Sequence, residues 1–567
     1  MQLETTLGAD GATVGGKRDP LVGQGLLTRL TVPMVEAFRS SGHWGSQTIY
    51  DCAYSHALHM PESPAVRERG AAISYGDLIA AADGMAAELE RVGLRPGDRI
   101  AVWMPSRIEV AILLLAASRN GYVICPSLHK NHTVSEIGEL VARMKARAVF
   151  VERDYGADAV GKDLEAEFAG LDHISLLSVL EPATGPRSWS HGDGVAGGPG
   201  GDADDIVYLA FTSGTTAAPK GVMHSNNTLL ANARSFAADW QIKPGSVVYT
   251  LSPLSHNLGF GAMVMCMMSG AEIVVHDLPR GASLLDRLKD TETSFIFGVP
   301  AHGMDLLAEI ETRKVAPPAK LTGFRISGAA APATLVSKLI EHGITPQSGY
   351  GMTEAGSHHY TRMDDDADRV VRSSGKACDG YDVAIFSVDD PDKPVEPGTV
   401  GQIGGRGASL MLGYFDNQAA TEAAFNRTGW FMTGDLGVLD ADGYLQITGR
   451  IKEIIIRGGH NIHPNKIEHL ATSYPAVERA AAVPVKDERL GEKVCLAVTV
   501  IPGGEVEAQA LLEHLANGGL SKFDMPEYFL VLDELPHSAN GKPLKRALTA
   551  AIEQGTYVPS PIRYRAK

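Results

Sequence analysis

Apolar segments of helix length and of strand length alternate along the first third of the chain, and this alternation limits the possible folds more than any other feature. Residues 74–92 have the helical period and end at Gly93, and residues 99–104 form an apolar run of strand length. Shorter apolar runs cover residues 122–125 and 148–151. Strands that alternate with helices pair in parallel and carry helices on both faces of the sheet. The sequence therefore predicts an α/β fold built from layered parallel sheets.

Two polar pairs have the spacing of helix capping boxes. Ser106 is followed by Glu109, and Thr133 is followed by Glu136, each pair just before an apolar segment. In a capping box the hydroxyl and the carboxylate satisfy backbone N–H groups at the start of a helix. We therefore expect a helix to begin after each pair.

The rest of the chain predicts further units, because 567 residues exceed what one core normally holds. Residues 373–413 contain short strand-like runs and glycine turns, which favour a small β-rich subdomain, and an α+β pattern follows Arg450. We expect an irregular N-terminal arm over residues 1–45, a large domain over 46–451 and a small domain over 452–567.

Composition excludes several classes of partner. The net charge is −16, from 51 Lys and Arg against 67 Asp and Glu, which disfavours nucleic acid and anionic membranes. No apolar run is long enough to span a membrane, and the N-terminus has no apolar segment typical of a secretory signal. The five cysteines are scattered without metal-ligand spacing. Free thiols of this kind favour a cytoplasmic protein.

The segment from Tyr208 to Asn226 carries the strongest chemical signal. An apolar strand is followed by small and hydroxyl-bearing residues and then by Pro219, Lys220 and Gly221. Hydroxyls, exposed N–H groups and a lysine after a strand can hold phosphate oxygens. The predicted ATP-binding residues of this segment are Thr212, Ser213, Gly214, Thr215, Thr216 and Lys220. The segment is not a Walker A loop, which needs glycine directly before the lysine and Ser or Thr after it. The alternative is a Ser/Thr-rich surface turn.

The combination of Ser-Gly-Thr-Thr with Pro-Lys-Gly resembles the phosphate loop of the AMP-forming adenylating enzymes. That superfamily includes acyl- and aryl-CoA ligases, peptide-synthetase adenylation domains and firefly-type luciferases. The resemblance extends over nearly the whole chain from about residue 50, with further motifs in the expected order. It implies a large N-terminal α/β domain with a small β-rich subdomain, hinged to a small mobile α+β C-terminal domain.

Further motifs resemble the family's nucleotide contacts. Tyr350 to Glu354 resembles the Y-G-x-T-E segment, in which Thr353 would contact the α-phosphate and Glu354 would bind Mg²⁺ together with Thr215. Asp435 and Arg450 would hold the ribose, since a carboxylate offers two acceptor oxygens. By the same resemblance, the remaining ATP contacts are Tyr350, Gly351, Gly328, Ala329 and Ala330, of which the last three form the adenine-binding stretch. Read alone, that stretch is equally well a plain strand-to-helix turn.

The C-terminal motifs concern the second substrate and domain movement. By resemblance Lys452 is the hinge residue, and Gly458, Gly459 and His460 contact the pantetheine arm of CoA. Lys466 stands where the family usually has an acidic residue.

Pro536 to Lys542 resembles the family's loop that carries the adenylation lysine, with Ser538 in place of a threonine. Lys542 would bridge the carboxylate and the α-phosphate as negative charge develops. The same spacing of proline, glycine and lysine matches the pattern that bacterial lysine acetyltransferases recognise, so Lys542 is also a candidate acetylation site. The alternative is a solvated Asn-Gly turn with a flanking lysine.

The acyl pocket is expected around His256, which the resemblance places as a gate. The predicted lining residues are His256, Asn257, Phe260, Gly298, Val299 and Gly349. Small, apolar and sulfur-bearing residues near the gate predict a compact apolar pocket, without a charged residue that would indicate an amino group or a second carboxylate on the substrate. His358 and His359 are adjacent on an extended segment, where side chains point in opposite directions, so we expect no metal site there.

Together these motifs predict an ATP-dependent carboxylate–CoA ligase. It would use ATP, Mg²⁺ and coenzyme A to make an acyl-AMP and then an acyl-CoA thioester, releasing pyrophosphate and AMP. The chain looks most like bacterial ligases for cyclohexanecarboxylate and for short- to medium-chain acids, so we expect a compact alicyclic, aromatic or short- to medium-chain acid. A homodimer is common in the family. The alternatives are an enzyme that loads a carrier protein and a nucleotide-binding regulator without catalysis.

Overall fold

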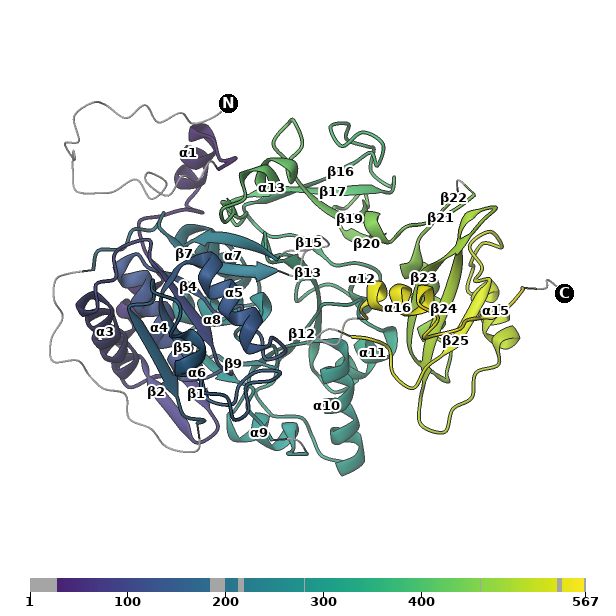
Figure 1. Ribbon diagram of the computed structural model, residues 1–567. Helices are drawn as coiled ribbons and strands as arrows, with labels where there is room; N and C mark the ends of the chain where they lie inside the picture. Colours follow the sequence, from purple (N-terminus) through teal and green to yellow (C-terminus); the bar gives the residue numbers. More distant parts are fainter. Residues whose placement is uncertain are drawn as a thin grey trace. The chain divides into compact units, whose positions relative to one another are not determined.

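The computed structural model describes residues 28–183, 199–212, 219–279, 281–458, 460–537 and 543–564. The chain divides into two compact units (Figure 1). The large unit comprises residues 1–383 and 405–431, and the small unit comprises residues 384–404 and 432–567.

The large unit contains a nine-stranded sheet whose central strands are parallel. From one edge to the other the strands are β15 (Lys376–Ala377), β14 (Gly356–Tyr360), β13 (Thr345–Met352), β12 (Gly323–Ser327), β11 (Phe295–Gly298), β9 (Val247–Thr250), β10 (Glu272–Val275), β1 (Pro64–Glu68) and β2 (Ala71–Ser74). Strands β14, β15 and β2 pair antiparallel at the two edges. The carboxyl ends of the parallel strands therefore meet at one edge, where ligands of open α/β sheets bind.

A second, seven-stranded sheet lies in the same unit. Its strands, in order, are β18 (Gly413–Tyr414), β8 (Lys220–Ser225), β7 (Ile206–Thr212), β4 (Val123–Cys125), β3 (Arg99–Trp103), β5 (Ala146–Glu152) and β6 (Leu176–Leu180). The strands from β7 to β6 are parallel, whereas β18, β8 and β7 pair antiparallel.

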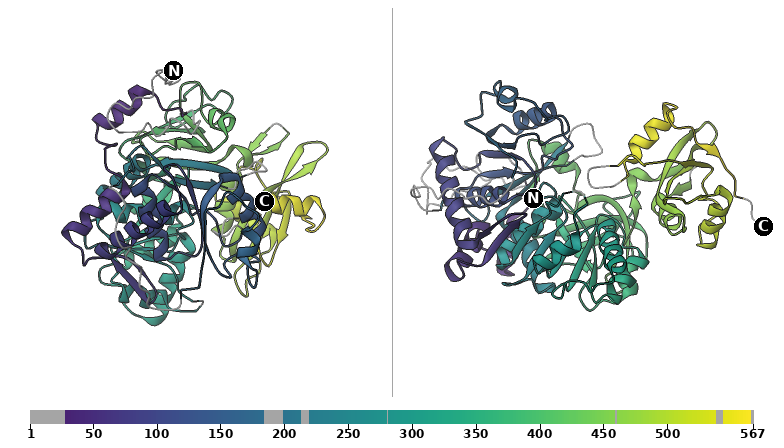
Figure 2. Two further views of the ribbon diagram at one scale, coloured as in Figure 1. Left: turned by 60° about the vertical axis from the view of Figure 1, so that its left-hand side comes forward. Right: turned by 90° about the horizontal axis from the view of Figure 1, so that it is seen from below.

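Helices cover both faces of these sheets (Figures 1 and 2). Helices α4 (Ile108–Asn120) and α8 (Asn257–Ser269) are apolar on nearly all sides, and they share one core cluster with residues of both sheets. The other helices of that cluster are α2 (Ile49–His59), α3 (Tyr75–Arg91) and α7 (Asn226–Asp239).

Two further clusters cover the outer faces of the sheets. Helices α1 (Val32–Ser40), α5 (Val134–Met144) and α6 (Leu164–Phe168) pack on the seven-stranded sheet. Helices α9 (Leu284–Asp290), α10 (Pro300–Arg313), α11 (Ala333–Glu341) and α12 (Ala367–Arg372) pack on the nine-stranded sheet. A short helix, α13 (Gln418–Ala423), follows β18.

The small unit combines a four-stranded sheet with an α+β module. The first sheet has the order β16 (Tyr381–Phe386), β17 (Gly401–Gly407), β19 (Phe431–Leu439) and β20 (Leu445–Arg450), and it lies largely in this unit. After the 3₁₀ turn η1 (Ile451–Glu453) come the strands β22 (His460–Ile462), β21 (Ile455–Arg457), β24 (Gly491–Val500), β25 (Tyr528–Val531) and β26 (Ser560–Pro561), in that spatial order, while β23 (Val477–Asp487) also pairs with β24. The helices are α14 (Pro464–Thr472), α15 (Ala508–Asn517) and α16 (Lys545–Glu553).

The structure confirms the α/β fold class and refines its details. Helix α3 follows its N-cap Ser74, and the Thr133–Glu136 capping box is present at α5. The Ser106–Glu109 prediction is wrong. Helix α4 begins after Arg107 without a side-chain cap, Glu109 pairs with Arg107, and the Ser106 hydroxyl instead accepts a hydrogen bond from the Leu254 N–H.

The segment predicted to be an irregular arm contains helix α1, which Thr31 caps. Met34, Val35 and Phe38 of this helix pack against the core at a helical spacing, which a segment of nine residues shows too briefly to stand out in the sequence. None of the described helices is long and apolar enough to cross a bilayer.

Candidate active site

The antiparallel hairpin of β7 and β8 carries the predicted phosphate loop. Thr212 ends β7 and pairs with Lys220, which begins β8, and the Thr212 hydroxyl donates to the Lys220 carbonyl at 3.4 Å. The loop between them includes the predicted residues Ser213, Gly214, Thr215 and Thr216, which lie outside the described residues. The Lys220 ammonium lies 4.7 Å from the centroid of the Tyr414 ring, a cation–π distance. The hairpin thus places a cation at the end of the predicted loop.

Tyr414 also connects Lys220 with the predicted metal ligand. Its hydroxyl donates a hydrogen bond of 3.0 Å to Glu354 Oε1, from the other sheet of the large unit. Burial raises the pKa of the Tyr414 hydroxyl, and the Glu354 charge raises it further. The phenol therefore stays protonated as a donor. The structure brings Lys220, Tyr414 and Glu354 together, so that one tyrosine contacts both the cation and the carboxylate.

The backbone around Glu354 is held by fixed contacts. The Thr353 carbonyl is bonded by His224 Nε2 at 2.7 Å, and the Met411 N–H donates to the Glu354 carbonyl at 2.7 Å. Burial lowers the pKa of His224 to about 4, so its imidazole is neutral and the Nε2 proton is the donor. Gly351 is required for packing, because a Cβ there would lie 2.2 Å from the Gly356 carbonyl oxygen. The turn between β13 and β14 is therefore rigidly positioned.

The predicted adenine-binding stretch lies at the carboxyl end of β12, where Ser327 pairs with Gly349 of β13. Gly328 has a φ of +85°, and Ala329 and Ala330 are exposed. The ring of Tyr350 on β13 lies 4.9 Å from that of His358. An exposed turn of small residues at the carboxyl end of a parallel strand leaves room for a flat purine base.

A small cavity of about 30 Å³ lies between α7, α8 and β14, with room for roughly two water molecules. Asn257 lines it, and its Nδ2 donates to the Met352 carbonyl at 3.4 Å. His224, Phe236 and Phe297 also line it. The cavity therefore reaches the segment that carries Thr353 and Glu354.

The other predicted pocket residues do not line this cavity. Phe260 lies on another side of α8, with its ring stacked 4.0 Å from that of Tyr208. His256 is the N-cap of α8, where its Nδ1 accepts from the Leu258 N–H at 3.3 Å. Val299 is the N-cap of α10. The sequence of α8 is apolar on all sides, so it does not indicate which side faces the cavity.

Neighbouring side chains occupy the space beside Gly298 and Gly349. A Cβ at Gly298 would lie 2.9 Å from the Phe324 ring, and one at Gly349 would lie 2.5 Å from the Arg325 guanidinium. Arg325 is fully buried and was not expected from the sequence. No signal in the sequence marks this burial, because an arginine between Phe324 and Ile326 also fits a strand whose alternate side chains face solvent.

The histidine pair differs from its prediction in geometry. His358 and His359 are both buried, with their Nδ1 atoms 2.7 Å apart. Burial lowers the pKa of His358 to about 3 and that of His359 well below its usual value. Both rings are therefore neutral, and one Nδ1–H donates to the other Nδ1.

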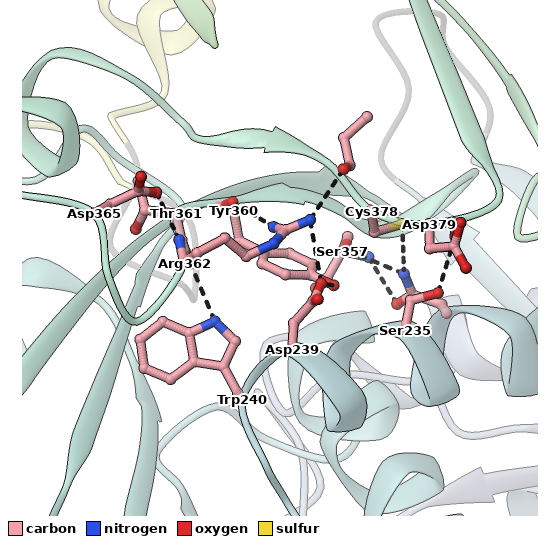
Figure 3. Close-up of polar contacts among 12 residues, drawn as sticks. Ser235, Asp239, Trp240, Ser357, Tyr360, Thr361, Arg362, Asp365, Cys378 and Asp379 are labelled. Atoms are coloured by element: carbon pink, nitrogen blue, oxygen red, sulfur yellow. Dashed lines mark hydrogen bonds and ion pairs between the residues drawn. The ribbon is translucent and has the colours of Figure 1, made fainter. Parts of the chain in front are cut away.

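A separate polar network joins α7 to β14 and β15 (Figure 3). Asp239 accepts from the Tyr360 hydroxyl at 2.8 Å and forms an ion pair with Arg362 at 3.1 Å. Arg362 also donates to the carbonyls of Tyr360 and Ala377. Every charge in this network has a partner, so it holds the helix to the sheet.

In the small unit, Asp435 and Arg450 are partners on β19 and β20. Arg450 Nε donates to Asp435 Oδ1 at 2.9 Å, and the Asp435 side chain is largely buried. This arginine holds the carboxylate that the resemblance assigns to the ribose.

The hinge and CoA predictions fall on nearby segments. Lys452 lies in η1, and its neighbour Glu453 pairs with Lys545 at 2.6 Å. Gly458 has a φ of +57°, and His460 Nε2 lies 2.7 Å from an Asp524 oxygen. Lys466 donates to the Gly519 carbonyl at 3.2 Å, a local contact that an acidic residue would not make. Gly459 and Lys542 lie outside the described residues.

Comparison with known proteins identifies the family. Residues 54–415 match the AMP-binding enzyme family, and residues 466–542 match the AMP-binding enzyme C-terminal domain. The chain therefore belongs to the AMP-binding enzymes. Within that family it is an acid–thiol ligase that uses ATP and CoA, as the sequence predicted.

Three relatives illustrate the range of substrates. The medium-chain fatty-acid–CoA ligase of Escherichia coli is 30% identical over 519 residues, covering 89% of this chain and 90% of its own. A salicylyl-CoA synthase / salicylate adenylyltransferase of Streptomyces is 30% identical over 540 residues, covering 91% and 96%. The crystal structure of ATP-bound MatB from Rhodopseudomonas palustris superposes with a TM-score of 0.78 at 26% identity, covering 90% and 99%.

Proposed function

We propose that the chain forms the acyl-AMP, with Lys220, Thr353 and Glu354 of the large unit at the phosphates. The arrangement of Lys220, Tyr414 and Glu354 is the observation that carries this proposal. A cation and a carboxylate held on one tyrosine supply both a phosphate contact and an oxygen ligand for Mg²⁺. The Glu354 carboxylate and the Thr215 hydroxyl are donors of the type that Mg²⁺ prefers. When bound, the ion would neutralise charge on the phosphates.

In the first half-reaction, a carboxylate oxygen of the acid forms a bond to the α-phosphorus while the bond to pyrophosphate breaks. Lys220 and the loop residues Thr212 to Thr216 hold the leaving pyrophosphate. The Thr353 hydroxyl donates to the α-phosphate, and Lys542 offsets the negative charge that develops between the two reactants. Adenine lies along Gly328 to Ala330, and Asp435 with Arg450 holds the ribose.

In the second half-reaction, the sulfur of CoA attacks the acyl carbon, the bond to AMP breaks and the thiol proton leaves to solvent. Gly458, Gly459 and His460 line the path of the pantetheine arm. We propose that Lys452 is the pivot between the two half-reactions, since Lys542 and CoA both need access to the same acyl-phosphate.

For the acid we propose cyclohexanecarboxylate or a similarly compact alicyclic, aromatic or short- to medium-chain acid. The small, apolar and sulfur-bearing residues that follow His256 on α8 support this proposal, because a compact apolar pocket rejects extra methylenes by clash. The relatives named for medium-chain fatty acids and for salicylate fit the same size range. A second candidate is transfer of the acyl group to a carrier protein instead of CoA.

Three further proposals rest on the family resemblance and on composition. Lys542 is a site for a lysine acetyltransferase, whose reaction would neutralise the ammonium. The protein is a homodimer. It resides in the cytoplasm, which agrees with five free cysteines, all of them buried.

Pyrophosphate release with a mixture of carboxylates, followed by chromatography of the thioesters, tests the activity. Glu354→Gln should lower the rate about 100-fold at fixed Mg²⁺, because a neutral amide is a poor ligand for the ion. Its matched control is Glu422→Gln on α13, an exposed residue outside the site. Equal rates in both variants would contradict the assignment of Glu354. Acyl-AMP that accumulates with CoA present would favour the carrier-protein alternative.

A further inference from the structure

Thr353 and Glu354 lie in a very short hairpin turn. Strand β13 ends at Met352 and β14 begins at Gly356, and these two residues pair with each other. The residues between them are Thr353, Glu354 and Ala355. The two residues proposed to contact the α-phosphate and Mg²⁺ are therefore at the tip of a hairpin, where their positions depend on what holds the strands beneath them.

Strand β14 needs hydrogen-bond partners at the base of this turn. On its outer side β15 pairs with Tyr360 and His359, and the Cys378 N–H donates to the His358 carbonyl at 2.8 Å. The next residue toward the turn, Ser357, lies beyond the end of β15. A backbone N–H and a carbonyl that have no strand beside them must be satisfied in another way.

Asn232 of α7 supplies both partners for Ser357. Its Oδ1 accepts from the Ser357 N–H at 3.0 Å, and its Nδ2 donates to the Ser357 carbonyl at 3.1 Å. A side-chain amide has the same donor and acceptor as a peptide group, so it can replace a strand residue. The fit is close at Gly356, which has a φ of +69° and where a Cβ would lie 2.8 Å from Asn232 Oδ1.

The three carbonyls of the turn also have fixed partners, which come from other parts of the chain. They accept hydrogen bonds from the His224 ring on β8, the Met411 N–H and the Ser409 hydroxyl, at 2.7, 2.7 and 3.1 Å. Asn232 acts on β14, the strand that leaves the turn. The backbone that carries Thr353 and Glu354 is therefore held at the turn itself and at its base.

Asn227 makes the same kind of contact from the same helix, but with a different segment. Its Oδ1 accepts from the Gly45 N–H at 2.9 Å, and its Nδ2 donates to the Gly45 carbonyl at 3.1 Å and to Asp204 Oδ1 at 2.7 Å. Gly45 lies between α1 and α2, in a segment to which the proposed function assigns no role. Asn227 is fully buried and Asn232 is half-buried, so Asn227 is a strict reference for a contact that is structural only.

We propose that Asn232 is a positioning residue for the first half-reaction, which holds Thr353 and Glu354 at the phosphates through Ser357. This inference rests on the proposed function and adds a residue to its site. Without the amide, the unpaired groups of Ser357 would turn toward water and β14 would shift beside the turn. Mg²⁺ demands near-ideal octahedral geometry, and a displacement of about 1 Å at a reacting group is costly, so a small shift is enough.

The test compares Asn232→Ala with Asn227→Ala, which remove the same two-point contact from the same helix. We expect Asn232→Ala to lower kcat/KM for MgATP about tenfold, measured by pyrophosphate release. Asn227→Ala should stay within about twofold of the wild type in kcat/KM. Chemical denaturation should show at least as large a loss of stability in Asn227→Ala, since Asn227 is the more buried residue. A purely structural role of Asn232 would lower stability and leave kcat/KM unchanged.

Binding gives a second readout that does not depend on turnover. Calorimetry with Mg²⁺ and with EDTA measures how much the ion tightens the binding of ATP. This gain should be about fivefold smaller in Asn232→Ala than in the wild type, and unchanged in Asn227→Ala. If Asn232→Ala does not fold, Asn232→Ser keeps a polar group and should show the same smaller gain, because a hydroxyl cannot reach both groups of Ser357.

The inference is overturned if Asn232→Ala, or Asn232→Ser in its place, equals Asn227→Ala in kcat/KM and in the gain from Mg²⁺. Glu354→Gln separates that result from a failure of the proposed function. If Glu354→Gln lowers the rate and the Asn232 variant does not, the assignment of Glu354 stands and Asn232 has only a structural role. If neither substitution lowers the rate, the assignment of Glu354 fails and this inference fails with it.

Discussion

The two units differ in how they treat positive charge near their candidate functional residues. In the small unit, Arg450 pairs with Asp435, and Lys545 pairs with Glu453 and Glu468. In the large unit, Lys220 and Arg325 lie against aromatic rings, and neither has a carboxylate partner among the described residues. Aromatic rings hold a cation in place and leave it available to an anion. The contrast is between cations that lie against rings, whose charge stays open to an anion, and cations that a carboxylate of the same unit neutralises.

The largest expected effect tests Lys542, the cation near the C-terminus that the proposed function assigns to the first half-reaction. Lys542→Ala should lower acyl-AMP formation about 1,000-fold, because it removes the charge that offsets the developing phosphate charge. Thioester formation from supplied acyl-AMP should be nearly unchanged, since that step does not build charge at the same place. Pyrophosphate release and thioester formation, measured separately, check this. An equal loss in both half-reactions would contradict the role of Lys542.

Next comes a stability effect within the small unit. Lys545 lies between Glu453 and Glu468, at 2.6 and 2.9 Å. Burial raises the pKa of Glu468, and Lys545 opposes that rise. Lys545→Met leaves a buried carboxylate unpaired, so we expect a loss of about 3 kcal/mol in the free energy of unfolding near pH 7.5. Chemical denaturation, followed through the unfolding transition of the small unit, measures this loss.

The pH dependence of this variant has a definite sign. A carboxyl whose pKa is higher in the folded state binds more protons folded than unfolded, so stability falls as pH rises through the folded pKa. In Lys545→Met the pKa of Glu468 rises further, and the variant should recover stability as the pH is lowered from 7.5 to 5. Lys486→Met is the control, because the Lys486–Glu553 pair is exposed and screened by solvent, so its loss should change stability little at any pH. Similar losses of stability in Lys545→Met and Lys486→Met would contradict the distinction between a buried and an exposed ion pair.

A smaller effect, on the rate of CoA transfer, is expected in the segment next to Glu453. Lys452 lies in η1, next to Glu453. Lys452→Pro fixes φ near −65°, so CoA transfer should slow about tenfold, equivalent to about 1.4 kcal/mol, while acyl-AMP formation continues. Single-turnover measurements of each half-reaction separate the two. Normal rates in both would show that the pivot lies elsewhere.

These contrasts also show what the sequence could reveal. Alternation of strands and helices predicted the fold, because periodicity records which faces are buried. The motif at Tyr350 to Glu354 and the residue Lys220 could be proposed from the sequence because short local patterns carry them. The burial of Arg325 was missed because it depends on which residues lie around the side chain after folding. The orientation of Phe260 was missed for a related reason. Helix α8 is surrounded by core, so it has no polar face to indicate which way each side chain points.

The smallest expected effect tests the tyrosine that joins the cation and the carboxylate of the large unit. Tyr414→Phe removes the hydroxyl that donates to Glu354 and keeps the ring beside Lys220. We expect the KM for MgATP to rise about fivefold with little change in kcat, because one hydrogen bond contributes about 1 kcal/mol. Tyr208→Phe on β7 is the matched control, because the Tyr208 hydroxyl is buried without a partner among the described residues. Its KM should equal that of the wild type. If both substitutions leave KM unchanged, the Tyr414 hydroxyl does not position Glu354, and the ring alone accounts for the contact with Lys220.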